Sequence, residues 1–231
     1  WSNRRNKFFP LATRSQLHQL ADTSLWQSTT TAQCQAAVAG HYPFFSHWQA
    51  ELGWPPNFNC DPVNNLDWPV GPHWLSTARS GPPRNDIKLV WESSRFSLAF
   101  ALARQYRYTG EEHWAEYFWQ MLDAWIEQNP VNHSVAWACG QETAFRIMAM
   151  LTAAFSTLDS VAATATRLQV LERLCWQSAK RIEANINYAI SQENNHALSE
   201  ATGLWTIGLL FPEFPESAQW RRIGRRVLES E

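Results

Sequence analysis

Apolar residues recur every three to four positions through most of the second half of the chain, which is the spacing of buried helix faces. Asp86 is a suitable N-cap for the first of these helices, and Gly110 is a suitable C-cap. Several of the helices are apolar around much of their circumference, so we expect burial on two sides. The expected helices are 87–109, 111–129, 135–158, 164–190, 197–211 and 215–231.

The first half of the chain has a different pattern. Two helices are expected over 11–28 and 31–39, the second stopped by Gly40. Residues 40–85 are rich in proline and cannot be helical for long, and no alternating stretch predicts a long strand. Because this segment also carries tryptophans, we expect an ordered loop layer packed across one end of the helices. Its tryptophans are Trp48, Trp54, Trp68 and Trp74.

Helices buried on two sides and joined by short connections favour nested antiparallel hairpins. We therefore predict an all-α fold, an incomplete α/α toroid with a Pro/Trp-rich loop layer, formed by residues 1–231 as a single helical domain. The net charge of −2 favours neither a nucleic-acid partner nor an anionic membrane surface. No apolar run approaches the roughly 20 residues of a membrane span.

Tryptophan is unusually frequent, with 14 residues. Large rings fill gaps between helices, which is the simpler interpretation, but a flat ring can also stack on the CH-rich face of a sugar. The four cysteines (Cys34, Cys60, Cys139 and Cys175) are far apart and form no C-x-x-C pair, which argues against a zinc or redox site. We expect no metal and no cofactor, and the spacing leaves the disulfide state open.

Two acid–base pairs lie within otherwise apolar helices. Glu92 and Arg95 are separated by three positions, and Glu142 and Arg146 by four, so each pair shares a helix face. One interpretation is an intrahelical ion pair in each case. The other is that both pairs line a polar cleft, where arginine offers its planar fork to a carboxylate or sulfate on a ligand.

Asn194, Asn195 and His196 stand at the entrance of an apolar helix, where such polar residues are unexpected. They could simply cap the helix. Alternatively, they could add neutral donors to the free N–H groups and partial positive charge of a helix N-terminus, which together suit a carboxylate. Stabilising a uronate carboxylate is what β-elimination requires, because loss of the C5 proton adds charge to an existing anion.

The chain resembles the N-terminal helical domain of the heparinase II/III-like polysaccharide lyases, a group that includes alginate lyases. The resemblance covers most of the chain from about Gly40 onward. It rests on five stretches in the expected order: "LGWPPNFNCDP", "DIKLVWESSRF", "QYRYTGEEHWAEYF", "NPVNHSVAWACGQETAFR" and "SQENNHALSEATGLWTIGLLFPEFPESAQWRRIG".

The resemblance implies a toroid whose groove binds an acidic polysaccharide. It implies that Asn195 and His196 act in catalysis by neutralising the uronate carboxylate, with Asn194 beside them. Glu142, Arg146 and Trp137 fall in a stretch that resembles a groove-lining one. The substrate class implies a periplasmic or secreted protein.

Such lyases also use a tyrosine after this segment and a histidine from a C-terminal β-sandwich domain. The last tyrosine here is Tyr188, before the segment. We therefore expect the chain to be the N-terminal part of a larger lyase that lacks this C-terminal domain and, alone, binds substrate without cleaving it.

Two other functions stay open. An α/α-toroid glycoside hydrolase would use Glu92 and Glu142 as its acid and base, which requires two free carboxyl groups flanking one glycosidic bond. A non-catalytic sugar-binding or scaffold domain would instead display exposed tryptophans unconnected with Asn195.

Overall fold

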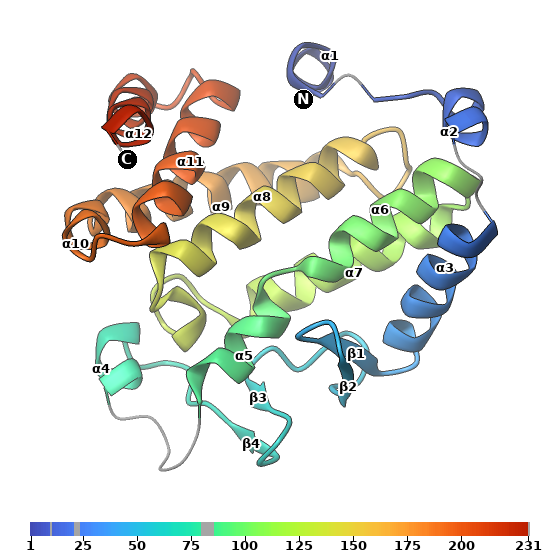
Figure 1. The fold of residues 1–231 in the computed structure, drawn as a ribbon, viewed down its shortest axis with the longest axis horizontal. Helices are drawn as coiled ribbons and strands as arrows, with labels where there is room; N and C mark the ends of the chain where they lie inside the picture. Colours follow the sequence, from blue (N-terminus) through green and yellow to red (C-terminus); the bar gives the residue numbers. More distant parts are fainter. Residues whose placement is uncertain (10, 21–23, 80–85, 231) are drawn as a thin grey trace.

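The computed structural model describes residues 1–9, 11–20, 24–79 and 86–230, which form a helical structure with two short hairpins (Figure 1). The helices of the first half are α1 (Ser2–Phe8), α2 (Arg14–Leu20), α3 (Ser24–Val38) and α4 (Trp74–Arg79). The helices of the second half are α5 (Ile87–Ser94), α6 (Ser97–Thr109), α7 (Glu112–Gln128), α8 (Gly140–Ser156), α9 (Ala165–Glu183), α10 (Ile186–Ser191), α11 (Asn195–Leu210) and α12 (Ser217–Ser230).

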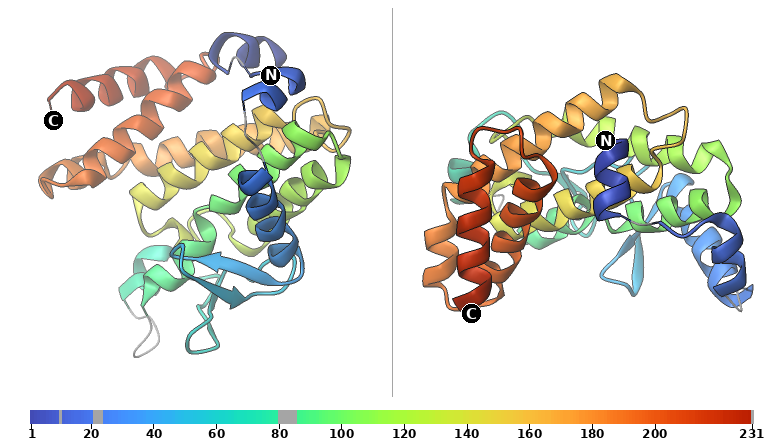
Figure 2. Two further views of the ribbon diagram at one scale, coloured as in Figure 1. Left: turned by 45° about the vertical axis from the view of Figure 1, so that its right-hand side comes forward. Right: turned by 90° about the horizontal axis from the view of Figure 1, so that it is seen from above.

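The long helices are arranged as successive hairpins. Helices α6, α8 and α11 pack side by side, while α7 packs on α6, α9 packs on α8 and α12 packs on α11. Seen from above, the described helices follow an arc whose two ends, at α3 and at α11–α12, do not meet (Figure 2). This arrangement confirms the prediction of an all-α, incomplete toroid. No helix in the described part of the chain is both long and apolar enough to cross a membrane.

The loop layer expected over 40–85 is present at one end of the helices (Figure 1). Strands β1 (His41–Phe44) and β2 (Trp48–Glu51) pair antiparallel, as do β3 (Cys60–Asp61) and β4 (Leu66–Asp67). These strands were not predicted, because they are only two to four residues long. The side chain of Gln128 holds the layer to α7, accepting a hydrogen bond of 2.8 Å from the backbone N–H of Phe58. The end of this segment, 80–85, lies outside the described residues.

The helix predicted over 87–109 has the expected ends but is broken in the middle. Asp86 accepts a hydrogen bond of 2.9 Å from the backbone of Lys88, and Gly110 has a φ of 75°, so both caps are confirmed. Between them, Phe96 takes a left-handed conformation with a φ of 60° and separates α5 from α6. Its ring stacks on Phe58 of the loop layer at 5.5 Å, so tertiary packing overrides the helical preference.

Other helix boundaries also differ from those predicted. The helix expected from Val135 begins at Gly140, after a 3₁₀ turn, η1 (Val135–Trp137). The helix expected over 164–190 divides into α9 and α10 at Asn185. The second N-terminal helix starts at Ser24 rather than at Thr31, so the predicted division at 29–30 is wrong. The helices exist where the apolar pattern places them, but their ends depend on contacts with distant segments.

The abundant tryptophans mostly serve the core, as the simpler interpretation predicts. The fully buried ones are Trp119, Trp125, Trp137 and Trp220. Among the tryptophans whose burial the structure describes, Trp176 and Trp205 are the exceptions, with 37% and 39% of their surface exposed. All four cysteines are buried and free, so the described structure contains no disulfide.

Candidate functional site

The N-terminus of α11 carries the segment Asn194–Asn195–His196. Asn194 precedes the helix in an extended conformation, and its side-chain oxygen accepts a hydrogen bond of 2.9 Å from the backbone N–H of His196. Asn194 is therefore the N-cap of α11, as the capping interpretation predicts. Asn195 is exposed, and its side chain makes no hydrogen bond with any residue that the structure describes. Its amide is available to a ligand.

The N-terminus of α8 lies against this segment, and both helices begin on the left-hand side of Figure 1. Cys139 precedes α8, and its Sγ is 3.9 Å from Nδ1 of the half-buried His196. Two positions further on, Gln141 Nε2 donates a hydrogen bond of 3.1 Å to Ser199 Oγ on α11. Two helix N-termini, each with a partial positive charge, therefore meet at one place, which favours an anionic ligand.

Glu200 lies beneath this junction as a buried carboxyl group. Burial raises its pKa from 4.5 to about 7, although Arg181 and a hydrogen bond from the backbone of Gln141 act in the opposite direction. The carboxyl group occupies the space that a Cβ at position 140 would need. Gly140 therefore makes room for this buried carboxyl group between α8 and α11, and a larger residue there would displace it.

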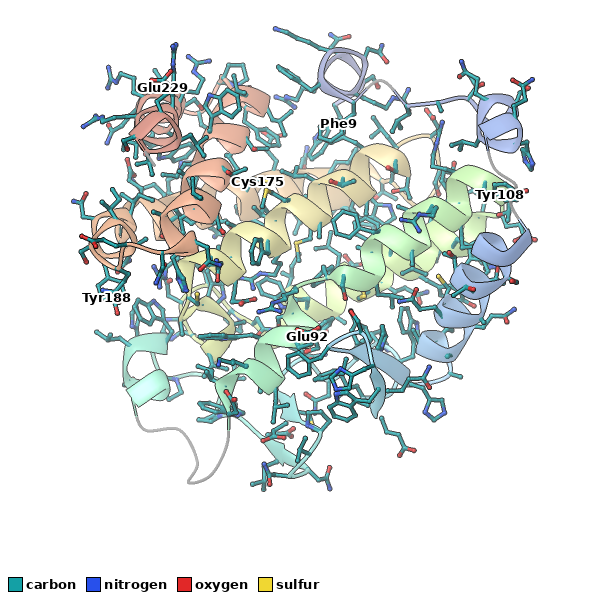
Figure 3. All side chains as sticks on the ribbon, in the orientation of Figure 1. Phe9, Glu92, Tyr108, Cys175, Tyr188 and Glu229 are labelled. Carbon is teal, nitrogen blue, oxygen red and sulfur yellow. The ribbon has the colours of Figure 1, made fainter. Side chains whose placement is uncertain are left out.

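Arg95 joins two helices through two carboxylates. Its Nε and Nη2 donate hydrogen bonds of 2.7 and 2.6 Å to Glu142 at the start of α8, and its Nη1 donates one of 2.8 Å to Glu92. The remaining oxygen of Glu92 accepts a hydrogen bond of 3.1 Å from the backbone N–H of Phe45, and Figure 3 shows Glu92 between α5 and the β1–β2 hairpin. The hydrogen bonds to Glu142 raise the pKa of Arg95. This side chain is about one-third exposed, at 35%.

The predicted ion pair of Glu92 with Arg95 is confirmed, and the pair of Glu142 with Arg146 is wrong. Arg146 is buried in the core, where its guanidinium lies 4.4 Å from the ring centre of Trp125 and 5.6 Å from that of Trp137. Burial lowers its pKa to about 9. Because α8 begins only at Gly140, the turn before it directs Trp137 into the core. Glu142 forms its ion pair with Arg95 and not with Arg146.

The expectation that Trp137 and Arg146 line a groove is therefore corrected, because neither has an exposed surface. The segment Asn194–Asn195–His196 and the cluster of Arg95 with its two glutamates are linked by Cys139. Its thiol is next to His196, and it directly precedes the first turn of α8, where Glu142 binds Arg95. Burial raises the pKa of the thiol itself, so it stays protonated near neutral pH. Among the described residues, no three side chains of His, Cys, Asp or Glu are grouped as metal ligands.

Two residues of this region were missed by sequence reasoning. Glu200 occupies a position of the apolar stripe of α11, one turn after Ala197 and one turn before Leu204, so a buried carboxyl could have been predicted. Arg181 falls in the buried stripe of α9 in the same way. It donates hydrogen bonds of 2.8 and 2.9 Å to the carbonyl oxygens of residues 137 and 138, which lie before the start of α8 and outside its hydrogen-bond pattern. These partners lie more than 40 residues away in the sequence and could not be predicted from it.

Comparisons with known proteins identify relatives of this chain. Residues 11–231 match the family described as heparinase II/III N-terminus. A heparin-sulfate lyase of Pedobacter heparinus is 30% identical over 155 residues, which are 64% of this chain and 23% of that protein. A heparin-sulfate lyase of Bacteroides stercoris is 27% identical over 220 residues, covering 86% of this chain and 30% of that protein.

The fold has the same relatives. The crystal structure of the heparan sulfate lyase HepC from Pedobacter heparinus matches 87% of this chain with a TM-score of 0.68 and 22% identity. The match covers 29% of that chain. This chain thus spans less than a third of the length of the curated and solved relatives described here.

Proposed function

Because the chain belongs to the heparinase II/III family, as the match over residues 11–231 establishes, we propose that it binds an acidic polysaccharide and that the full-length protein cleaves this polymer by β-elimination. The similarity to heparin-sulfate lyases supports the reaction class. The meeting of two helix N-termini at an unbonded amide supports the binding of an acidic group. The size and class of the substrate support a periplasmic or secreted location.

The proposed catalytic role of Asn195 and His196 is to stabilise negative charge on the uronate carboxylate. Removing the C5 proton of a uronate spreads a second unit of charge onto that group. Donors fixed in place beforehand stabilise the enolate-like state more than the ground state, which is the difference that accelerates a reaction. The N-termini of α8 and α11 and the ring of His196, next to Cys139, are held in place in this way, and the exposed amide of Asn195 stands beside them at the start of α11.

Arg95 has a supporting role in this proposal. Its guanidinium has five N–H groups, of which three donate to Glu92 and Glu142. The remaining two can contact a carboxylate or sulfate of the bound polymer, and the two glutamates hold the fork in place for this purpose. We assign the base and the acid of the elimination to no residue of this chain.

The site geometry does not favour the hydrolase alternative. A glycoside hydrolase needs one carboxyl group that can donate a proton and another that can act as a base or nucleophile. Glu142 is 3% exposed and both its oxygens bind Arg95, while Glu92 binds Arg95 and the backbone of Phe45. Neither is free to transfer a proton to or from a sugar.

The reaction class can be tested with a panel of polymers. The full-length protein is incubated with heparan sulfate, alginate, hyaluronan and chondroitin sulfate, and two signals are followed: the ultraviolet absorbance of an unsaturated uronate and the number of new reducing ends. We expect both signals to rise together on at least one polymer, because elimination creates a C4–C5 double bond at each cut. Reducing ends without absorbance would establish hydrolysis instead. Binding without either signal would establish a non-catalytic sugar-binding domain.

A further inference from the structure

A pocket of about 390 Å³ lies between α4 and the last turns of α9, apart from the Asn195 segment. In Figure 1, α4 lies on the left-hand side below α10, the helix that follows the end of α9. Two tryptophans, Trp74 and Trp176, line this pocket, together with the cations Lys180 and Arg181. The volume falls in the range of about 300–1,000 Å³ that is typical of ligand pockets.

The lining of this pocket combines flat apolar faces with polar groups. Trp176 is held by a hydrogen bond of 3.1 Å from its Nε1 to Glu216, yet 37% of its surface is exposed. Such a fixed and exposed ring costs little entropy to place against a ligand. Its π face is electron-rich and attracts the C–H groups on one face of a pyranose ring. Asn132 and Asn185 also line the pocket, and side-chain amides suit sugar hydroxyl groups. Nδ2 of Asn185 donates a hydrogen bond of 3.3 Å to the carbonyl oxygen of Arg181.

The charge of the lining favours an acidic ligand. Among the described residues that form the pocket there are two cations and no carboxylate. Lys180 is paired with Glu183 at 3.0 Å and with Glu216 at 3.6 Å beside the pocket, so Arg181 is the lining cation without an ion pair in the described structure. The guanidinium of Arg181 lies 4.1 Å from the ring centre of Trp74, and its Nη1 is buried without a hydrogen-bond partner in the described structure. Oδ1 of Asn132 is also buried without one. A buried polar atom without a partner costs free energy, and a ligand group that reached either atom would recover part of that cost.

We infer that this pocket is an accessory subsite for an acidic sugar unit, which binds the same polysaccharide chain whose uronate is held at Asn195. The inference rests on the proposed function for the identity of the polymer. The two sites are connected through the protein, because Arg181 donates hydrogen bonds to the carbonyl oxygens of Trp137 and Ala138. Those residues lead directly to Cys139, which contacts His196.

The test is the affinity of the full-length protein for polymers in the Asn195→Ala background, where turnover does not deplete the ligand. The probes are size-defined heparan sulfate and hyaluronan fragments, with neutral dextran for comparison, and binding is measured by titration calorimetry. Trp176→Ala is expected to weaken binding of the acidic polymers about tenfold, the effect of losing one aromatic stacking contact. If Lys180 contacts a sulfate group, Lys180→Gln weakens the binding of heparan sulfate and leaves that of hyaluronan unchanged. If Lys180 contacts a carboxylate, the variant weakens the binding of both acidic polymers.

Two controls separate the subsite from general effects. Trp205→Ala removes an equally exposed tryptophan from α11, outside the pocket, and is expected to leave affinity unchanged. Trp176→Phe retains an aromatic face and is expected to retain most of the affinity. Equal affinities of Trp176→Ala and its parent would overturn the inference, as would a parent that binds neither acidic polymer. Failure of the wild-type protein to produce unsaturated uronate would count against the proposed function alone, since these affinities do not depend on turnover.

Discussion

At the scale of single residues, Glu200 makes the stability of the protein depend on pH. Its carboxyl group faces Arg181 from α9 and the backbone N–H of Gln141 from α8, and burial nevertheless raises its pKa to about 7. The folded state therefore binds a proton more tightly than the unfolded state. The resulting contribution to stability is present below pH 4.5 and is lost as the pH rises to about 7.

The variant Glu200→Gln should remove this dependence, since it is uncharged at every pH. The variant is expected to become more stable than the wild type as the pH rises from ~5 to ~8, and the difference in their free energies of unfolding should grow by on the order of 3 kcal/mol over this range. Urea unfolding at several pH values measures the difference. Glu193→Gln, at an exposed position, is the matched control. A stability difference that stays constant with pH would show that Glu200 ionises as freely as a surface carboxylate.

The sequence predicts residues well where their partners are local. The cap formed by Asn194 needs only the backbone two positions later, and the pair of Glu92 with Arg95 needs only one helical turn. The sequence does not predict the partner of Glu142, because that partner, Arg95, follows another helix and lies 47 positions earlier in the chain. A rule based on spacing pairs Glu142 with Arg146, the cation one helical turn away, and takes no account of a residue as distant in sequence as Arg95.

At the scale of elements, the α11–α12 hairpin depends on close approach of the two helices. A Cβ at position 224 would lie 2.6 Å from the carbonyl oxygen of Ala201 and 2.8 Å from Cβ of Trp205. In an ordinary helix, replacing glycine by alanine stabilises by about 1 kcal/mol. Gly224→Ala should instead destabilise the protein by about 1–3 kcal/mol, because the clash involves backbone that cannot move aside.

Thermal or chemical unfolding measures this effect, with Arg226→Ala as an exposed control on the same helix. An unchanged or increased stability of Gly224→Ala would mean that α11 and α12 pack less closely than the structure shows.

The existence of the elements could be predicted better than their ends. Apolar spacing locates the helices, and Asp86 and Gly110 mark their termini through local hydrogen bonds and conformation. The break at Phe96 depends on a ring of the loop layer, and the late start of α8 depends on Arg181 of α9. Those contacts exist only after folding, so the sequence predicts helices that are too long at both places.

At the scale of the whole molecule, helical hairpins arranged in an arc bring the starts of α8 and α11 together. The predicted order of helices implied antiparallel neighbours, but it did not show which helix ends would share a site. That outcome follows from the packing of α8 directly against α11, which glycines at positions 140 and 203 permit. With a net charge of only −2, attraction of an acidic polymer depends on this local arrangement rather than on a global field.

The central claim is that Asn195 stabilises the uronate carboxylate as the C5 proton leaves. The most direct test compares the rate of unsaturated uronate formation by the full-length wild-type protein and by Asn195→Ala. The variant should lose about 100-fold or more in kcat, with little change in KM, as expected for a donor that acts mainly in the transition state. Asn3→Ala, an exposed asparagine on α1, should behave as wild type. A value of kcat for Asn195→Ala close to that of the wild type would contradict the account.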